Sequence, residues 1–425
     1  MSSPVPSPRG VESPADNPST YLEGPARQKL VWSILISSTA LFACYLAAGS
    51  VLLPIQVENL DPANRETNLA IVTSLSSFAT LFVQPIVGAL SDRTRSRLGR
   101  RAPWMLGGAV LGGIMLTLIP HIGVNVALVA VMWVLAQVSL NSVQGPMSAL
   151  VADRLAPTYR GTASAFFGVG MTLGTMVGVV GAGFMVTQLG LGYAVFGIAV
   201  IVLVGLLVFL NQDQSSKGMA LPAFSWLEFA KGFGRPFRSA DFRWAFAQRF
   251  VMFLSYMGIV GYMLYILTGY VGLTTEEAGP IMALQQMVNS GFAIAATFLA
   301  GPLSDKLGRR KIFVFVAPFF VAVGCVFPIL MPNVMGILFL AAFAGIGFGA
   351  YMAVDVALVV DILPNPEEAA KDLGVINIAN NVPQMFAPIV NAVLIANIGY
   401  VALFPWAIVL AIFAAFLVFP IKGVR

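Results

Sequence analysis

Residues 88–101 read Gly88-Ala-Leu-Ser-Asp92-Arg-Thr-Arg-Ser-Arg-Leu-Gly99-Arg-Arg101, and residues 301–310 read Gly301-Pro-Leu-Ser-Asp305-Lys-Leu-Gly308-Arg-Arg310. Each stretch follows an apolar segment, at equivalent places in the first and second halves of the chain. A second echo, Asp153-Arg-Leu-Ala-Pro157 against Asp361-Ile-Leu-Pro364, comes two apolar segments later. The two halves of the chain therefore repeat each other, and repeated halves with a solute site at their interface are typical of secondary transporters.

The composition places this duplication in a membrane. Of the 425 residues, 58% are hydrophobic and only 10% are charged, and the mean hydropathy is +0.85. Soluble globular proteins carry about 25% charged residues, so a soluble domain is excluded. Intrinsic disorder is excluded as well, because it needs low hydrophobicity. We therefore expect a polytopic protein whose partner is the lipid bilayer, and the net charge of +5 reflects membrane topology rather than nucleic-acid binding.

Twelve apolar segments are long enough to cross a bilayer, which takes about 20 helical residues. They are residues 31–54, 68–90, 103–121, 124–151, 162–186, 190–210, 244–270, 279–303, 311–331, 334–362, 373–398 and 400–420. Such runs are too long for the strands of a membrane barrel. The sequence therefore predicts an all-α membrane protein with twelve transmembrane helices in two pseudo-symmetric six-helix halves.

The polar stretches give the expected domain boundaries. Residues 1–29 are rich in Pro, Ser and charge and lack the apolar core of a signal peptide, which indicates a disordered cytoplasmic tail. Residues 30–210 form the N-terminal six-helix half and residues 244–421 the C-terminal half. Between them, residues 211–243 are polar and form a cytoplasmic central loop.

The basic residues indicate the orientation. If twelve segments alternate across the membrane from an inside N-terminus, every one of the 24 Lys and Arg residues except Arg65 lies on the inner side. Cytoplasmic loops carry the excess of Lys and Arg in membrane proteins. We therefore expect a multi-pass protein of the cell inner (cytoplasmic) membrane, with both termini in the cytoplasm.

The repeated loops place charged residues at the cytoplasmic mouth of the two halves. Acids and bases at matching points of a repeat favour ion pairs that latch the halves in one state and release them in another. The alternative is that these charges serve topology alone. The predicted cytoplasmic gate consists of Asp92, Arg93, Arg100, Arg101, Asp153, Asp305, Arg309, Arg310 and Asp361.

Asp355 stands apart from the other acidic residues, which lie in tails, loops or segment ends. It lies about two turns inside segment 334–362, where a charged side chain costs about 2.5–3.5 kcal/mol on insertion scales. Arg249, near the same end of segment 244–270, is its candidate partner. The two residues are predicted to form a proton-coupling site or, alternatively, a permanent structural ion pair.

The remaining polar residues within the apolar segments are mostly amides and tyrosines. Amides both donate and accept hydrogen bonds, which suits a neutral, hydroxyl-rich ligand. The alternative is hydrogen bonding between helices, which membrane bundles use routinely. The predicted substrate-binding residues are Tyr45, Gln137, Asn141, Gln144, Tyr256, Gln285, Asn289, Tyr351, Asn377, Asn380, Asn381 and Gln384.

The sequence offers no pattern for a metal, a cofactor or an enzyme active site. Cys44 and Cys325 lie in separate apolar segments without metal-ligand spacing. A phosphate-binding loop is absent, which argues against direct drive by ATP. We expect no catalytic residue, no metal and no cofactor.

The repeated loop resembles the signature loop of the major facilitator superfamily, which implies the fold of that superfamily. Further motifs resemble the sucrose–proton and related glycoside–cation symporters: the run from Val83 to Trp104, the run from Asn141 to Asp153, and the run from Leu373 to Met385. One position departs from the pattern. Ser148 stands where the sucrose symporters carry an arginine tied to sugar and proton handling, so the resemblance does not extend to sucrose itself.

The resemblance implies a secondary active transporter that works by alternating access on a small neutral polar solute. A sugar or glycoside is the expected substrate, with a proton (or Na⁺) as coupling ion and a monomer as the expected state. One alternative is a proton-coupled exporter of an amphipathic metabolite or drug. Another is a membrane receptor without transport, for which we find no signalling domain.

Overall fold

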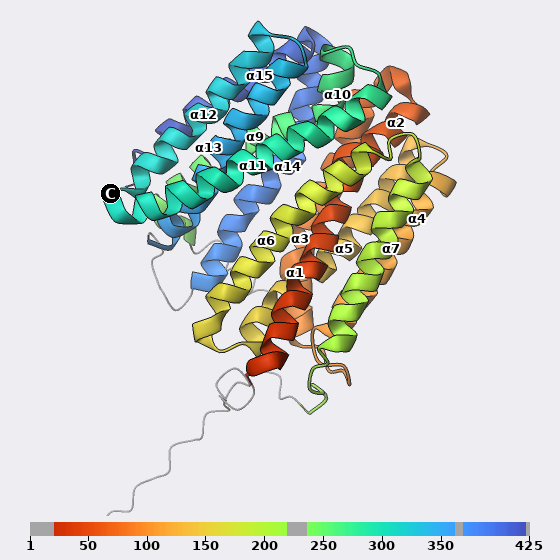
Figure 1. The fold of residues 1–425 in the computed structure, drawn as a ribbon, viewed down its shortest axis with the longest axis vertical. Coiled ribbons are helices and arrows are strands. Elements are labelled where there is room, and N and C mark those ends of the chain that lie inside the picture. The colour runs from red at the N-terminus through yellow and green to blue at the C-terminus, as the bar shows by residue number, and fades with distance from the viewer. Residues whose placement is uncertain (1–20, 219–235, 362–368, 422–425) are drawn as a thin grey trace, which may run out of the picture.

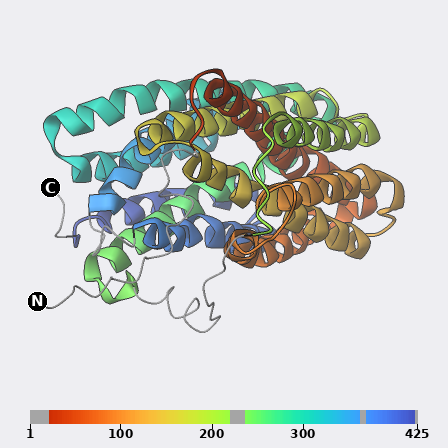
Figure 2. The ribbon, with the colours of Figure 1, turned by 90° about the horizontal axis from the view of Figure 1, so that it is seen from below.

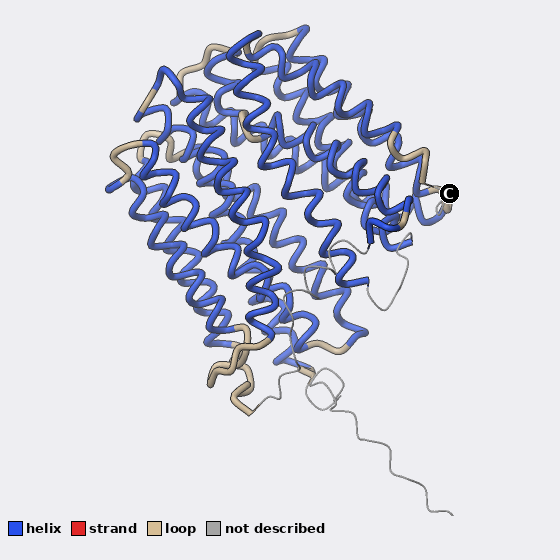
Figure 3. The backbone as a smooth tube through the Cα atoms, turned by 180° about the vertical axis from the view of Figure 1, so that it is seen from behind, coloured by secondary structure: helices blue, strands red, loops and turns tan. Residues whose placement is uncertain are grey.

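The computed structural model describes residues 21–218, 236–361 and 369–421, and within these ranges it leaves some side chains undescribed. The described residues form helices and short turns, without a strand, as Figure 3 shows. This confirms the predicted all-helical class. Among the predicted site residues, the side chains of Asp305, Asp361 and Asn377 lie outside what the structure describes. Most of the predicted tail and the middle of the predicted central loop also lie outside it.

The first half of the bundle, here the N-half, comprises α1 to α7. Its bounds are α1 Gly24–Ala47, the π-helical turn η3 Ala48–Leu52, α2 Leu53–Leu60, the 3-10 turn η4 Pro62–Asn64, α3 Arg65–Asp92, α4 Ala102–Ile122, α5 Val126–Arg154, α6 Pro157–Gly183 and α7 Leu189–Leu210. The π-helical turn joins α1 to α2, so that one helical span of 37 residues runs from Gly24 to Leu60.

The second half, here the C-half, comprises α9 to α15. Its bounds are η5 Pro236–Arg238, α9 Ala240–Val260, α10 Met263–Tyr265, η6 Ile266–Tyr270, α11 Thr275–Leu307, α12 Arg310–Leu330, α13 Val334–Asp361, α14 Ala369–Ile398, η8 Tyr400–Ala402 and α15 Leu403–Phe416. Several helices begin earlier or end later than the predicted segments, because backbone hydrogen bonding continues into polar residues that hydropathy excludes.

The span count from the described residues is ten, or eleven when one bent pair is counted as a single span. The bent pair is α9 with α10–η6, which meet at an angle of 47° where one continuous segment was predicted. Gly261 ends α9 at this point. The last apolar helix, Tyr400–Phe416, is shorter than the others. It occupies the place of the twelfth predicted segment.

The two halves lie side by side (Figures 1 and 2). Within the N-half, α1 packs on α6 and α7, and α5 packs on α3 and α4. Within the C-half, α13 packs on α11 and α12, and α9 packs on α14 and α15. The most extensive contacts between the halves are those of α3 with α14 and of α6 with α11.

Glycines permit the close packing of α6. A Cβ atom placed on Gly174 would lie 2.5 Å from the carbonyl oxygen of Thr39 on α1. Near the far end of the same helix, a Cβ atom on Gly183 would lie 2.5 Å from the carbonyl oxygen of Gly279 on α11. Small residues let helix backbones approach in membranes, where van der Waals packing replaces the hydrophobic effect. The same helix thus holds its own half together and touches the other.

Candidate functional site

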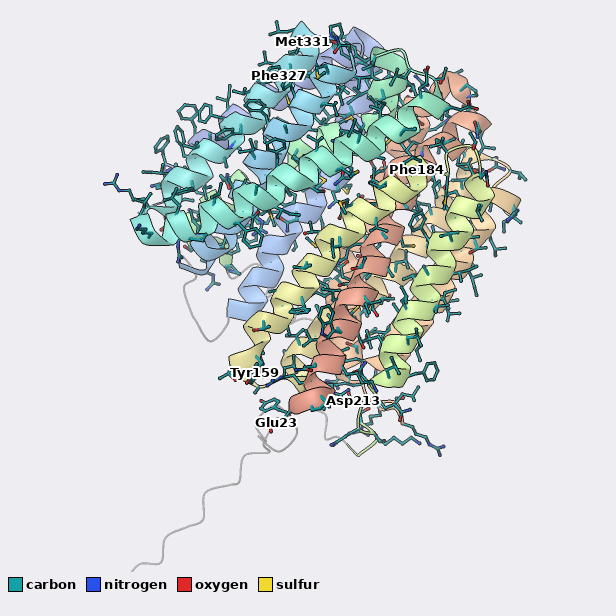
Figure 4. The ribbon with its side chains drawn as sticks, viewed as in Figure 1. Glu23, Tyr159, Phe184, Asp213, Phe327 and Met331 are labelled. Carbon is teal, nitrogen blue, oxygen red and sulfur yellow. The ribbon has the colours of Figure 1, made fainter. Side chains whose placement is uncertain are left out.

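The end of the molecule at which α1 begins, here the Asp92 end, carries a charge cluster. Figure 4 marks this end with Tyr159 and Asp213 and the opposite end of α6 with Phe184. Arg101 pairs with Asp92 at 2.5 Å and with Asp153 at 2.9 Å, and Arg100 pairs with Asp153 at 2.5 Å. The cluster joins α3, the start of α4, and α5. It brings together four residues of the predicted gate, and each of these ion pairs lies within the N-half.

The loop glycines of the two repeats share one backbone conformation. Gly99 has φ +84° and Gly308 has φ +60°, both in the left-handed region that favours glycine. A Cβ atom on Gly99 would also lie 2.7 Å from the Cβ atom of Asp213, whereas Gly308 has no atom within 4 Å. The repeated motif therefore encodes a tight turn in both halves, and the N-half turn is the more crowded one.

The other described members of the predicted gate belong to helix ends. Arg93 follows the last residue of α3, and Arg309 precedes α12, which begins at Arg310. The neighbouring Lys311 donates to the carbonyl oxygens of Phe419 at 2.9 Å and Ile421 at 2.5 Å.

A buried polar cluster lies inside the C-half. Arg249 on α9 forms an ion pair with Asp355 on α13, with 2.9 Å between Nη1 and Oδ2. The Arg249 Nε atom also donates to Oδ1 of Asn380 on α14 at 2.6 Å. The hydroxyl of Tyr351 lies 2.8 Å from Oδ1 of Asp355. With exposed fractions of 3% for Arg249 and 1% for Asp355, the pair is removed from water and ties three helices together.

The interior of the N-half holds neutral amides instead. Gln84 on α3 donates from Nε2 to Oδ1 of Asn141 on α5 at 3.0 Å, and Asn141 donates to the carbonyl oxygen of Gln137 at 2.8 Å. Gln137 and Gln144 are partly buried, and Ser148, two turns beyond Asn141 on α5, is exposed. All charged residues of this half lie at helix ends or in loops. Gln84 was not among the predicted substrate-binding residues, although it precedes Pro85 within an apolar segment.

Three of the predicted substrate-binding residues lie between helices of the C-half. Tyr256 on α9 donates to Oδ1 of Asn289 on α11 at 3.1 Å, and Asn289 donates to the carbonyl oxygen of Ala341 on α13 at 3.1 Å. Tyr256, Asn289 and Gln285 all line one small cavity between these helices. The Tyr256 ring also stacks on Phe348, with 4.0 Å between centroids. These contacts are hydrogen bonds between helices, which the sequence analysis gave as the alternative to substrate binding for these residues.

The remaining predicted residues lie on α1 and α14. Tyr45 makes an edge contact with Phe42, with 5.7 Å between ring centroids. Asn381 is partly buried, and Gln384 is exposed and donates to the carbonyl oxygen of Asn380 at 3.3 Å. Since α14 packs on α3 of the other half, these amides lie on a helix of the interface between the halves.

The opposite end of the molecule, here the Arg65 end, holds a link that sequence reasoning missed. Arg65 pairs with Glu58 and, at 2.9 Å, with Glu66, and its Nη2 atom donates to the hydroxyl of Tyr400 at 3.1 Å. Tyr400 donates in turn to Glu66, and Tyr262 donates to the backbone oxygen of Glu66 at 2.8 Å. Arg65 and Glu66 belong to α3, whereas both tyrosines belong to the C-half. Arg65 could have pointed to this link in the sequence, because it is the one basic residue assigned to the outer side and acidic residues, Asp61 and Glu66, lie on both sides of it.

Asp61 lies beside this link, in the turn between α2 and α3. The side chain of Asn64 donates to it at 3.0 Å, and that of Asn68 at 2.9 Å. These hydrogen bonds lower the pKa of the Asp61 carboxyl from its ordinary value. The carboxylate therefore stays charged at neutral pH and fixes the turn that leads into Arg65.

Further hydrogen bonds across the halves belong to the same side of the molecule. Tyr265 donates to the carbonyl oxygen of Pro54 at 2.9 Å, and Ser74 donates to that of Met385 at 2.7 Å. In Figure 1 the halves meet around α2 and α10 and diverge toward the start of α1. The described contacts therefore join the halves at the Arg65 end.

Comparisons with known proteins agree with this architecture. The family model described as Major Facilitator Superfamily matches residues 34–297 and 250–424. The sucrose transport protein SUC4 of Arabidopsis thaliana is 31% identical over 191 residues, which cover 40% of this chain and 36% of that protein. An uncharacterized symporter of Synechocystis, sll1374, is 62% identical over 40 residues, which cover 9% of this chain and 7% of that protein. The chain thus spans about a third or less of the length of these curated relatives.

Solved structures show the same fold at low sequence identity. A bacterial homolog of the human lysosomal transporter Spinster, in an inward-facing and unoccupied conformation, superimposes with a TM-score of 0.71 at 16% identity. The match covers 94% of this chain and 98% of that one. A D-xylose-proton symporter gives a TM-score of 0.71 at 14% identity, with the same coverage.

Proposed function

The chain belongs to the major facilitator superfamily, and from that premise we propose that it couples proton movement to the transport of a small neutral polar solute, a sugar or glycoside. Membership confirms the predicted superfamily and the prediction that the protein is a transporter rather than an enzyme. The substrate class, the coupling ion and the role of each residue are the proposal.

The contrast between the interiors of the two halves carries this proposal. The N-half presents the neutral Gln84–Asn141 pair, whose amides match the hydroxyl groups of a sugar. The C-half holds the Arg249–Asp355 pair, whose carboxylate is the fully buried acidic group among the described side chains. Similarity of a 191-residue segment to a plant sucrose transport protein supports the sugar. The exposed Ser148, in place of the arginine of the sucrose symporters, favours a sugar other than sucrose.

Protonation of Asp355 would change the cost of moving helices in the C-half. The charged carboxylate attracts Arg249 in a site that excludes water, where charges interact strongly. A proton on Asp355 removes that attraction and leaves Arg249 with its hydrogen bond to Asn380. Proton binding therefore loosens α9 from α13, and loss of the proton tightens them again. Alternating access needs such a difference between states.

The membrane orientation belongs to the same proposal. Basic residues gather at the Asp92 end, which places that end and both termini in the cytoplasm by the positive-inside rule. In this orientation the Arg65 end, where the halves are joined, faces outward, the protein lies in the inner membrane, and a single chain contains both halves. Na⁺ is the alternative coupling ion, and an exporter of an amphipathic compound is the alternative transporter.

The test is electrical. The protein is reconstituted in liposomes, a panel of mono- and disaccharides is applied under a proton gradient, and the substrate-induced current is recorded. We expect a sugar-dependent current that falls more than tenfold in Asp355→Asn. Unchanged pH-dependent transport in this variant would reject the coupling role of Asp355. The exporter alternative would be supported if no sugar gave a current while cells gained protection from an amphipathic toxin.

A further inference from the structure

The hydroxyl of Tyr351 lies between two oxygen atoms inside the C-half. One is Oδ1 of Asp355 at 2.8 Å, one turn along the same helix, and the other is Oε1 of Gln248 on α9 at 3.0 Å. A tyrosine hydroxyl has a single hydrogen to donate. It can therefore satisfy only one of these oxygens as a donor. The second short contact needs a hydrogen from another group.

Two arrangements supply that hydrogen. When Asp355 carries a proton, its carboxyl donates to Tyr351, and Tyr351 donates to Oε1 of Gln248. When Asp355 is charged, Tyr351 donates to the carboxylate, and the Gln248 amide must turn so that Nε2 donates to Tyr351. In both arrangements α9 and α13 stay connected, but the direction of every hydrogen bond in the chain is reversed.

The surroundings of Gln248 agree with an amide that can turn. In the described structure its Nε2 atom has no hydrogen-bond partner, so no other contact fixes the orientation of the amide. The side chain is 1% exposed, so bulk solvent does not reach the amide. A buried polar group without a partner costs about 1–3 kcal/mol. Either orientation leaves one amide atom unpaired, so the hydrogen bond with Tyr351 decides which way the amide faces.

We propose that Tyr351 and Gln248 are positioning residues for the proton on Asp355, forming a hydrogen-bond chain whose direction reverses when Asp355 gains or loses that proton. The inference rests on the proposed coupling role of Asp355. One proton from the aqueous phase joins the carboxylate, and no other bond is made or broken. Because Gln248 directly precedes Arg249, the chain keeps α9 attached to α13 while the ionic contact beside it is released.

Among the charged side chains that the structure describes, Arg249 is the one that contacts Asp355. The helices that pack on α13 are α9, α11, α12 and α14. The other charged residues of these helices lie at or near helix ends: Asp241, Arg243, Glu276, Glu277, Lys306, Arg310 and Lys311, and Lys371 and Asp372, whose side chains lie outside the description. Asp305, also near the end of α11, has an undescribed side chain too. The pH response of the chain is therefore assigned to Asp355 itself.

The test compares pH profiles of proton-driven uptake in proteoliposomes for Tyr351→Phe, Gln248→Met and the double variant. We expect Tyr351→Phe to move the midpoint upward by about one pH unit, because the hydrogen bond lost by the charged carboxylate is stronger than the one lost by the neutral carboxyl group. Gln248→Met should move the midpoint in the native background and produce no further shift in the Tyr351→Phe background. Such non-additivity is the signature of residues that act as one unit.

Ser255→Ala is the matched control. Ser255 lies on α9 as well and donates to the carbonyl oxygen of Ala407 at 2.8 Å, so this variant removes a buried hydrogen bond between helices outside the chain. We expect its midpoint to equal that of the native protein. Infrared spectroscopy gives a second readout: the carboxylic C=O band lost in Asp355→Asn should change frequency in Tyr351→Phe.

The outcomes separate this inference from the proposed function. If Asp355→Asn keeps its pH dependence, the coupling role fails and the chain fails with it. If Asp355→Asn loses pH dependence while Tyr351→Phe keeps the native midpoint and C=O frequency, only the chain is rejected. Additive shifts in the double variant would also reject it. Should Tyr351→Phe fail to fold, an unmoved midpoint and an unmoved C=O band in Gln248→Met would overturn the proposal.

Discussion

The interiors of the two halves differ although the halves share a fold and a loop motif. In the N-half, α3 and α5 meet through the neutral Gln84–Asn141 pair. In the C-half, α9 and α13 meet through the ion pair of Arg249 and Asp355. An ion pair responds to a proton, whereas an amide pair responds to a ligand that donates and accepts hydrogen bonds. The two halves thus share one helical architecture, but a neutral amide pair joins the helices in one and an ion pair joins them in the other.

The largest expected effect tests whether charge inside the C-half is needed for folding. Arg249→Met leaves Asp355 buried without its cation, which should reduce the free energy of unfolding by about 3–5 kcal/mol. The double variant Arg249→Met/Asp355→Leu should recover most of this stability. It should show no proton-driven transport. Thermal unfolding in detergent measures the first effect and liposome uptake the second. A native melting temperature for the single variant would mean that solvent reaches the pair.

The next effect tests the neutral interior of the N-half. Asn141→Leu removes the acceptor of Gln84 and one amide offered to the solute, so we expect the apparent KM to rise about tenfold to a hundredfold, with proton coupling retained. Uptake kinetics at a fixed proton gradient measure it. Ser142→Ala is the control, since Ser142 donates within its own helix to Val138. If Asn141→Leu abolished coupling and left the KM unchanged, the division between the halves would be wrong.

The smallest effect compares the two loop glycines. Gly99→Ala places a Cβ atom in a left-handed turn and against Asp213, so the free energy of unfolding should fall by about 2 kcal/mol or more. Gly308→Ala meets the same backbone strain in open space and should cost about 1 kcal/mol. Thermal unfolding of the two variants side by side measures the difference. Equal costs would show that the crowding by Asp213 is relieved by a shift of the loop.

Much of the fold was predictable because it depends on local, additive properties. Hydropathy over about 20 residues located the apolar helices, and the repeated loop located the duplication. The bend after Val260 was missed, since residues 244–270 are apolar throughout and hydropathy carries no signal for a change of direction. The candidate partner of Asp355 was found because two opposite charges at one membrane depth have few other partners.

The predicted amides show where this reasoning stops. Gln285 and Asn289 have the spacing of one helix face, but that face lies among the helices of the C-half, where Asn289 bridges Tyr256 and Ala341. Spacing places residues on a common face and does not say which neighbour the face meets. The Arg65–Tyr400 link joins residues 335 positions apart, so no local pattern could show it.

The sequence by itself determined that this chain is a duplicated helical membrane protein, which end of it is basic, and which acid lies inside the bundle. These features follow from the depth of each residue in the bilayer, which depends on its near neighbours in sequence. Only the tertiary structure decided that Tyr351 stands between Gln248 and Asp355, that Gln84 meets Asn141, and that the halves are joined at the Arg65 end. The physical reason is that the rotation of each helix about its axis is set by close packing against other helices, and hydropathy carries no information about that rotation.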